Sequence, residues 1–206
     1  MLDVMDLGSP VLDVYPGARG KLLATLAQLE TPVTARSLAR HAGVSPQTAL
    51  DVVDDLSEAG VVQVRRTGGL ALVMLNREHV LAEPVVMLAR ARGRLIQRLS
   101  GDLAGWRGLA AAWLFGSAAR GDGDRDSDID LFLVAETAVD DAGWAAAIGR
   151  LAERVHAWTG NHAEIIEHSW GSFVRLVRED NALIAAIRAD GIALTPDSRG
   201  RLRDAA

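Results

Sequence analysis

The sequence predicts an α+β protein with two domains: a helical N-terminal domain that ends in a β-hairpin, and a small α/β domain with a short mixed sheet. The chain has 206 residues, a length that suits two compact domains. Up to about residue 76, helical spacing of apolar residues is followed by two short strand-like runs. After residue 105, strand-like runs alternate with helical patterns, which is typical of a sheet flanked by helices.

Composition excludes several classes of protein. Hydrophobic residues make up 49% of the chain, enough for a substantial core, but no run approaches the roughly 18 uncharged apolar residues of a membrane span. The first residues are acidic and lack the basic stretch of a signal peptide. Cysteine is absent, so disulfides and thiolate metal sites are excluded. We therefore expect a cytoplasmic protein without a membrane, and the formal charge of −5 argues against a generally basic nucleic-acid binder.

The N-terminal helices are indicated by apolar spacing and by capping residues. Residues 20–30 place leucines on one helical face. A second helix is expected between the capping residue Thr34 and Gly43. A third should start at Ser45 and Pro46, because serine caps a helix well and proline fits its first position.

Two short strands, at residues 61–66 and 70–75, follow these helices, and Thr67-Gly68-Gly69 between them is typical of a hairpin turn. The succession of helix, helix, turn, helix and hairpin resembles a winged helix-turn-helix over residues 18–76. The resemblance implies that the helix at 45–59 enters the DNA major groove and that the hairpin touches the DNA backbone.

The charges of this domain restrict how it could bind DNA. The 45–59 helix carries four acidic residues and no basic one, so only Gln47 and Thr48 near its start could read base edges. Phosphate contacts would have to come from arginines elsewhere, namely Arg36, Arg40, Arg65 and Arg66. Because DNA affinity depends largely on neutralised phosphates, tight binding would require a homodimer. A surface for protein contact or dimerisation is the alternative.

The expected domain boundaries follow from these patterns. Residues 1–82 should form the winged-helix domain, residues 83–104 a connecting amphipathic helix that Pro84 opens, and residues 105–206 the α/β domain. In the last of these we expect, in order, a strand at 111–116, a strand at 128–135, a helix at 138–158, a strand at 162–168, a helical pattern at 170–189 and a short strand at 191–195.

Five aspartates fall on every second residue from Asp122 to Asp130, and the last two lead into an apolar strand. An EF-hand is excluded, because the sixth position is Ser127 instead of glycine and the twelfth is Leu133 instead of glutamate. Side chains alternate along a strand, so Asp128 and Asp130 share a face and could share divalent cations. The three upstream aspartates should lie in a solvated loop.

Upstream of these carboxylates, Gly116 and Ser117 follow an apolar run, where the backbone can approach a phosphate and the hydroxyl can add a hydrogen bond. The stretch FGSAARGDGDRDSDIDLFLV resembles the DNA polymerase β-like nucleotidyltransferase superfamily, and in particular its small stand-alone members, the minimal nucleotidyltransferases. The glycine, the serine, Arg120, the Asp-x-Asp pair and both apolar runs match the motif together. With its flanking strands, the resemblance covers about residues 105–195.

The resemblance implies a reaction. A nucleoside monophosphate, expected to be AMP, would pass from a nucleoside triphosphate, expected to be ATP, to a hydroxyl acceptor, with Mg²⁺ or Mn²⁺ and release of pyrophosphate. Asp128, Asp130 and a third carboxylate would hold the metal ions. Gly116 and Ser117 would hold the terminal phosphates, and Arg120 would help to neutralise them.

The third carboxylate should come from the strand at 162–168. We choose Glu164, which alternation places on one face with His162 and His168, and keep Glu167 on the other face as the alternative. The superfamily more often has aspartate here, so the longer side chain of Glu164 could shift the second metal ion. A zinc site of both histidines is disfavoured, because six strand residues separate them by roughly 20 Å.

The acceptor is not fixed by these residues. We expect a small molecule or a protein hydroxyl, because the chain shows none of the extra domains that hold tRNA in larger relatives. Minimal nucleotidyltransferases include toxin–antitoxin components and antibiotic-modifying enzymes, and nothing in the sequence selects among them. The rival hypothesis is a DNA-binding transcriptional regulator whose nucleotidyltransferase domain only senses nucleotide.

Overall fold

The computed structural model describes residues 4–67, 70–137 and 142–205. The chain divides into two compact units: an N-terminal unit, Ser9–Ala91, and a sheet unit made of Arg92–Ala206 together with Met1–Gly8. The division at residue 91 lies inside the segment that we expected to be a single connecting helix. Residues 4–8 pack with the sheet unit instead of with the residues that follow them.

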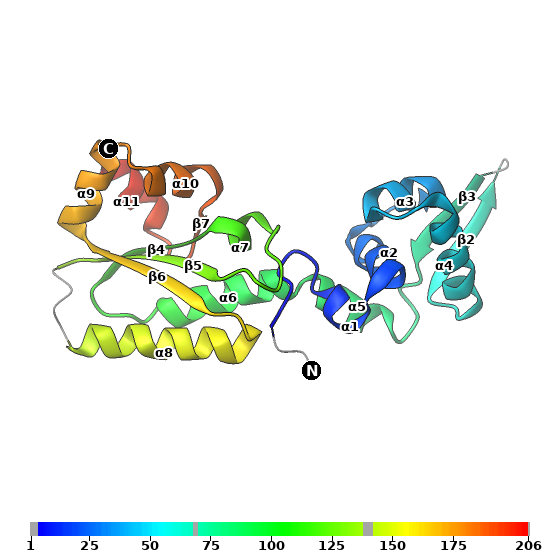
Figure 1. Ribbon diagram of the computed structural model, residues 1–206, viewed down its shortest axis with the longest axis horizontal. Helices are drawn as coiled ribbons and strands as arrows, with labels where there is room; N and C mark the ends of the chain where they lie inside the picture. The colour runs from blue at the N-terminus through cyan, green and yellow to red at the C-terminus, as the bar shows by residue number, and fades with distance from the viewer. Residues whose placement is uncertain (1–3, 68–69, 138–141, 206) are drawn as a thin grey trace. The chain divides into compact units, whose positions relative to one another are not determined.

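The helices of the N-terminal unit are α1 (Val11–Val14), α2 (Gly17–Gln28), α3 (Ala35–Ala42), α4 (Pro46–Glu58) and α5 (Ala82–Ala89) (Figure 1). Two of them, α3 and α4, begin and end where the capping residues predict, whereas α1 was not expected, α2 starts three residues before the expected 20–30 helix, and α5 starts before Pro84. The side chain of Thr34 accepts a hydrogen bond from the backbone of Ser37, and Gly43 ends α3 in the left-handed conformation. Ser45 caps α4 in the same way, by accepting from the backbone of Thr48.

A three-stranded antiparallel sheet completes this unit. Its strands are β1 (Val33–Thr34), β2 (Val62–Thr67) and β3 (Leu70–Leu75), in the order β1-β3-β2. The expected hairpin pairing of β2 with β3 is present, whereas β1 was not expected. Gly68 and Gly69 of the expected turn lie outside the described residues. The order of helices and hairpin is the one expected, and its interpretation as a winged helix stays a prediction.

The connecting helix is two helices, because its halves pack into different cores. The backbone leaves helical geometry at Arg90 (φ −99°, ψ 6°), between α5 and α6 (Ala91–Leu103). Val85 of α5 is buried in the core of the N-terminal unit, while Leu95 and Leu99 of α6 are buried in the sheet unit. Amphipathic spacing continues across the break, so the pattern alone does not reveal it.

The sheet unit is built on the mixed sheet that the sequence predicts. Its strands are β4 (Leu109–Phe115), β5 (Ile129–Ala135), β6 (Ala163–Ser169) and β7 (Ile192–Ala193), in the order β6-β5-β4-β7. β5 and β6 are parallel, and β4 is antiparallel to both β5 and β7.

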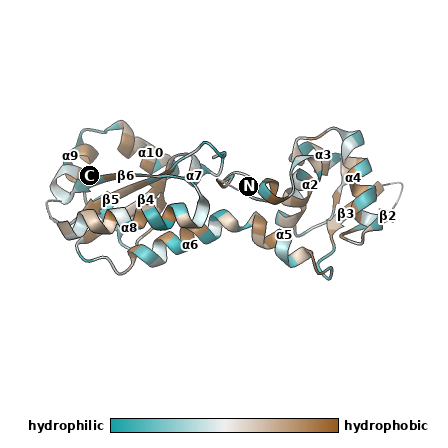
Figure 2. Ribbon diagram, turned by 60° about the horizontal axis from the view of Figure 1, so that its bottom comes forward, coloured by the Kyte–Doolittle hydropathy of each residue, from teal (hydrophilic) through white to brown (hydrophobic). Residues whose placement is uncertain are grey.

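Helices cover both faces of this sheet (Figures 1 and 2). α6 and α8 (Ala142–Thr159) lie on one face, where Leu131 and Leu133 of β5 are buried. α9 (Trp170–Arg178), α10 (Ala182–Asp190) and α11 (Ser198–Asp204) lie on the other, where Phe132 and Val134 are buried. Asp130 therefore lies on the same face of β5 as the buried residues Phe132 and Val134. The unbroken apolar run of β5 does not show that both faces of the strand are covered.

Three helical features differ from the expectations. The pattern at 170–189 is two helices, separated at Asp180, which has a positive φ of 47°, and at Asn181, which caps α10. The short helix α7 (Gly116–Arg120) directly follows β4, and α11 follows β7; neither was expected. No described helix is both long and apolar enough to span a membrane.

Candidate active site

Two carboxylates meet at the start of β5. Asp130 is the second residue of β5, and its register partner across the parallel pair is Glu164 of β6. Register partners in a sheet share a face, so both side chains emerge on the same side. Asp128 immediately precedes the strand, and its charge acts on Asp130 together with that of Glu164. The geometry therefore brings the three predicted carboxylates into one neighbourhood.

The environment of Asp130 disfavours its charged form. Partial burial is the main cause of a raised pKa at this carboxyl, and repulsion from Glu164 and Asp128 adds to it. Arg120 opposes the rise by its positive charge. Among the residues that the structure describes, no three carboxylate or histidine side chains converge closely enough to hold a metal ion together. Hard carboxylate oxygens with uncompensated charge nevertheless fit Mg²⁺ or Mn²⁺, which would draw these side chains together.

The two glutamates of β6 lie on opposite faces. Glu167 has Leu133 as its register partner and accepts a hydrogen bond from the indole Nε1 of Trp144 in α8. Glu164 lies on the face of Asp130. The alternation that we used for Glu164 and Glu167 thus matches the structure, although the catalytic role of Glu164 stays a prediction.

The two histidines next to these glutamates do not share a face, contrary to the alternation. The ring of His168 lies 5.8 Å from that of Phe132, on the side of Asp130. His162 instead stacks on His156 of α8, with ring centroids 5.5 Å apart, on the other side of the sheet. Alternation fails for His162 because it precedes β6, which begins at Ala163.

Gly116 forms the wall against Asp130. It has a φ of +68°, which L side chains rarely adopt, and a Cβ added there would overlap the Asp130 carboxylate and come within 2.9 Å of its Cγ. Only glycine therefore allows the backbone to turn from β4 into α7 this close to the carboxylate. The predicted glycine turn is present and lies directly beside the carboxylate pair.

Ser117 and Arg120 belong to the same turn. The carbonyl oxygen of Ser117 accepts hydrogen bonds from the backbone N–H groups of Gly121 (2.8 Å) and Asp122 (3.2 Å). Arg120 donates from Nε to Asp122 (3.1 Å) and lies 3.7 Å from the carboxylate of Asp190. The hydrogen bond to Asp122 is the main cause of a raised pKa at Arg120. Arg120 thus stays charged but is already paired.

The loop that follows is ordered by its own aspartates. Asp124 accepts hydrogen bonds from the hydroxyl of Ser127 (2.8 Å) and the backbone N–H of Asp126 (3.1 Å). We expected the aspartates at 122, 124 and 126 to lie in a solvated loop, and all three are exposed. In addition, the first binds Arg120 and the second builds the turn that delivers Asp128 to the strand.

Asn161 was missed by the sequence reasoning. It is 1% exposed, and its Nδ2 donates to the carbonyl oxygens of Ser127 (3.0 Å) and Met5 (3.2 Å). Its Oδ1 accepts from the backbone N–H of Met5 (3.2 Å). A single asparagine thereby fixes the residue before Asp128 to the N-terminal segment. Nothing in the local sequence distinguishes it from a loop asparagine.

Two residues that flank the N-terminal unit in the chain, Arg92 and Gly8, bind the segment that contains the glycine turn. Arg92 donates from Nε to the carbonyl of Ala118 (2.7 Å) and from its guanidinium to that of Ala119, at the end of α7. The backbone N–H of Gly8 donates to the carbonyl of Gly123 (2.7 Å). Arg92 is therefore a structural arginine of the sheet unit.

The residues expected to contact DNA lie on the N-terminal unit. Arg36 and Arg40 line a pocket of 510 Å³ together with Thr34, Ser37, Ala39, Val44 and Pro46. Arg65 and Arg66 are exposed on β2. The two residues expected to read DNA bases, Gln47 and Thr48, instead form hydrogen bonds at the start of α4. Gln47 donates to Asp51 (2.8 Å), and the hydroxyl of Thr48 lies 2.7 Å from that of Ser45.

Comparison with known proteins agrees with this geometry. The family model "Nucleotidyltransferase domain" matches residues 96–175, from α6 into α9, and this stretch contains the glycine turn and all three carboxylates. The match supports a nucleotidyltransferase domain over these residues, the domain of a transferase.

Two solved structures are similar to part of the chain. The first, "Crystal structure of the toxin-antitoxin with AMP-PNP", is 21% identical, with a TM-score of 0.37 over 54% of this chain and 79% of its own. The second, a mutant of the toxin–antitoxin MntA–HpeT, is 17% identical, with a TM-score of 0.36 over 55% of this chain and 80% of its own. No curated protein matches the chain.

Proposed function

We propose that the chain transfers a nucleoside monophosphate from a nucleoside triphosphate, expected to be ATP, to a hydroxyl acceptor. The observation that carries the proposal is the register pair of Asp130 and Glu164 directly beside the glycine turn at Gly116. The acceptor oxygen would attack the α-phosphorus of the triphosphate in line with the bond to pyrophosphate. A P–O bond forms, pyrophosphate leaves, and the acceptor hydroxyl gives up its proton.

The residues of the site divide this work. Gly116 leaves the backbone bare beside Asp130, so phosphate oxygens can approach the N–H groups of the turn. Ser117 adds a hydroxyl donor, and Arg120 supplies a positive charge to the leaving pyrophosphate. Asp128, Asp130 and Glu164 would hold Mg²⁺ or Mn²⁺, which when bound neutralises phosphate charge and makes the acceptor oxygen more acidic.

A transfer assay tests this proposal. The protein is incubated with α-labelled ATP, Mg²⁺ and clarified cell lysate, and Asp128→Asn/Asp130→Asn serves as the inactive control. The expected result is a labelled product with the wild type and none with the double variant. A labelled protein would favour the toxin–antitoxin alternative, and a labelled small molecule an antibiotic-type acceptor. Nucleotide binding without any product would instead favour the nucleotide-sensing regulator.

A second function, DNA binding, is favoured by the pocket on α3. Arg36 and Arg40 line this pocket together with Ser37, and neither arginine has an ion-pair partner among the described residues. Two guanidinium groups and a hydroxyl are suited to binding a phosphate of the DNA backbone. Because Gln47 and Thr48 are engaged within α4, we propose backbone contacts with little base reading. Binding should therefore be sensitive to salt and tight only for a homodimer.

Gel shift against DNA from upstream of the gene, at low and moderate salt, measures this second function. Replacing Arg36 and Arg40, or Arg65 and Arg66, by alanine should abolish the shift and leave nucleotide transfer unchanged. If the wild type gives no shift even at low salt, the N-terminal unit is better interpreted as a surface for protein contact or dimerisation.

A further inference from the structure

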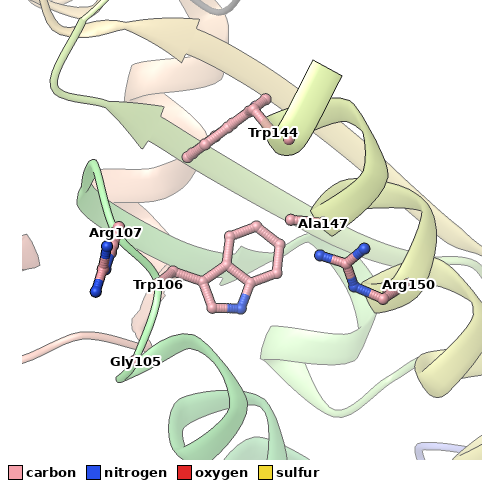
Figure 3. Close-up of a pocket in the computed structure, with 7 residues that line it drawn as sticks. Gly105, Trp106, Arg107, Trp144, Ala147 and Arg150 are labelled. Carbon is pink, nitrogen blue, oxygen red and sulfur yellow. The ribbon is translucent and has the colours of Figure 1, made fainter. Parts of the chain in front are cut away.

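A second pocket lies on the face of the sheet that α8 covers, away from the carboxylates. It has a volume of 340 Å³ and is lined by the residues that lead into β4 and by the first turns of α8, namely Gly105, Trp106, Arg107, Gly143, Trp144, Ala147 and Arg150 (Figure 3). This volume falls in the range of about 300–1,000 Å³ that is usual for small-molecule sites.

Two tryptophans form the wall of this pocket. The rings of Trp106 and Trp144 meet edge to face, with centroids 5.8 Å apart and planes at 87°. Trp144 is fixed by the hydrogen bond from its Nε1 to Glu167, and both indoles pack partly against the core of the sheet unit. The aromatic wall is thus held in place by the fold, although each indole keeps exposed surface.

Two arginines flank this wall. Figure 3 shows the guanidinium groups of Arg107 and Arg150 on opposite sides of the Trp106 ring. Both side chains are exposed, and neither has an ion pair or hydrogen bond to any residue that the structure describes. In a chain with a net charge of −5, two uncompensated guanidinium groups beside an indole make a local site for an anion.

The pocket is separate from the active site. Trp106 precedes β4, and the first residue of β4, Leu109, pairs with Ala135 at the end of β5. Asp130 lies near the opposite end of β5, at its start. Five strand residues span about 17 Å. The pocket also opens on the α8 side of the sheet, while Asp130 and Glu164 face the other side.

We infer that this pocket binds a nucleoside phosphate without a metal ion, as a second nucleotide site distinct from the proposed transfer site. The indole wall supplies a surface on which a base can stack. The two guanidinium groups supply charge-assisted hydrogen bonds to the phosphate, and they replace the cation that the carboxylate site needs. The ligand must therefore combine a flat ring with an anionic group, and neither part alone should bind well.

The test measures binding by calorimetry in EDTA, on the Asp128→Asn/Asp130→Asn variant, so that the proposed transfer site is silent. The probes are ADP, adenosine and inorganic pyrophosphate. We expect ADP to bind with a stoichiometry of one per chain, and adenosine and pyrophosphate to bind at least about tenfold more weakly, since each lacks one of the two interactions.

Variants assign the binding to the pocket. Arg107→Gln/Arg150→Gln, added to the same background, should weaken ADP binding at least tenfold. Arg94→Gln/Arg199→Gln removes two exposed arginines elsewhere in the sheet unit and gives the same change in net charge. This control should bind ADP like the parent.

Three results would overturn the inference: no ADP binding at millimolar concentration, equal loss in the control pair, or pyrophosphate binding as tightly as ADP. Because every measurement is made in EDTA with the aspartates removed, none of these results bears on the proposed transfer reaction.

Discussion

Asp130 is half-buried between the glycine turn and Glu164, and both its burial and its carboxylate neighbours raise its pKa. A raised carboxyl pKa means that the folded state binds the proton more tightly than the unfolded state, so without a cation the charged form costs stability at neutral pH. The charged form of Asp130, which the proposed reaction needs, therefore lowers the free energy of unfolding when no cation is bound.

We predict that Asp130→Asn stabilises the metal-free protein. Removing the charge should raise the Tm in EDTA at pH 7 by a few degrees, corresponding to about 1 kcal/mol in the free energy of unfolding. Thermal unfolding followed by circular dichroism measures this. Because burial raises the pKa of Asp130 in the folded state, the difference should shrink as the pH falls through that raised pKa. It should vanish only below about pH 3, where the wild-type carboxyl is protonated in both states. A lower Tm for the variant at pH 7 would show that the carboxylate makes stabilising contacts instead.

The two glutamates of β6 give a second prediction at this scale. Glu164→Gln should reduce turnover by on the order of 100-fold or more, the usual effect of removing one group that stabilises the transition state. Glu167→Gln should leave turnover almost unchanged, because its carboxylate binds Trp144 on the other face. Steady-state kinetics with the acceptor found in the lysate measures both. The reverse pattern would assign the third carboxylate to Glu167.

Among the elements, the loop before β5 depends on the N-terminal segment through Asn161. We predict that Asn161→Ala destabilises the sheet unit by about 1–3 kcal/mol, because it leaves buried backbone groups of Met5 and Ser127 without partners. It should also weaken Mg-ATP binding, since the residue before Asp128 is no longer fixed. Chemical denaturation and calorimetry measure the two effects.

Asn181→Ala is the matched control for this prediction. Asn181 caps α10 by accepting from the backbone of Leu183 and is exposed, so its loss should cost stability but leave Mg-ATP affinity unchanged. Equal nucleotide affinity in the two variants would reduce Asn161 to a structural residue only.

Most strands and capped helices could be predicted from the sequence, because their signals are local. Thr34, Gly43 and Ser45 act through neighbours within four residues along the chain. The break at Arg90 could not be predicted, since it arises when two halves of one apolar stripe enter different cores.

The same limit applies to the site. The glycine turn and the carboxylates form a compact motif of sequence, and alternation along one strand separates Glu164 from Glu167. Asn161 and Arg92 act on residues about 26 to 156 positions away in the chain, as their contacts with Ala118 and Met5 show. Contacts of that range leave no periodicity that a single sequence could reveal.

At the scale of the whole molecule, the N-terminal unit is an insertion into the sheet unit. Residues 4–8 belong to the sheet unit, and the chain leaves it after Gly8 and returns at Arg92. Both junctions are bonded to the same short segment, Gly8 to Gly123 and Arg92 to Ala118 and Ala119. Leu7, beside the first junction, is 1% exposed.

We predict that a chain starting at Arg92 is less stable than one in which residues 9–91 are replaced by a short linker. The truncated chain loses the burial of Leu7, worth about 1.5–3 kcal/mol, and the contacts of Met5 with Asn161. A linker of eight glycine and serine residues, which can reach about 26 Å when extended, replaces the N-terminal unit in the second protein. Urea denaturation compares the two proteins, and equal midpoints would contradict the prediction.

This insertion also sets the order in which the protein can fold during synthesis. Residues 4–8 are made before Ser9–Ala91, yet their partners Gly123, Thr159 and Asn161 emerge more than a hundred residues later. Ser9–Ala91 is complete in sequence long before then, so it can fold while the segment ahead of it still waits for its partners. Closing so long a loop is slow. We therefore expect the N-terminal unit to form before the carboxylate site, which needs β6 and Asn161 from later in the chain.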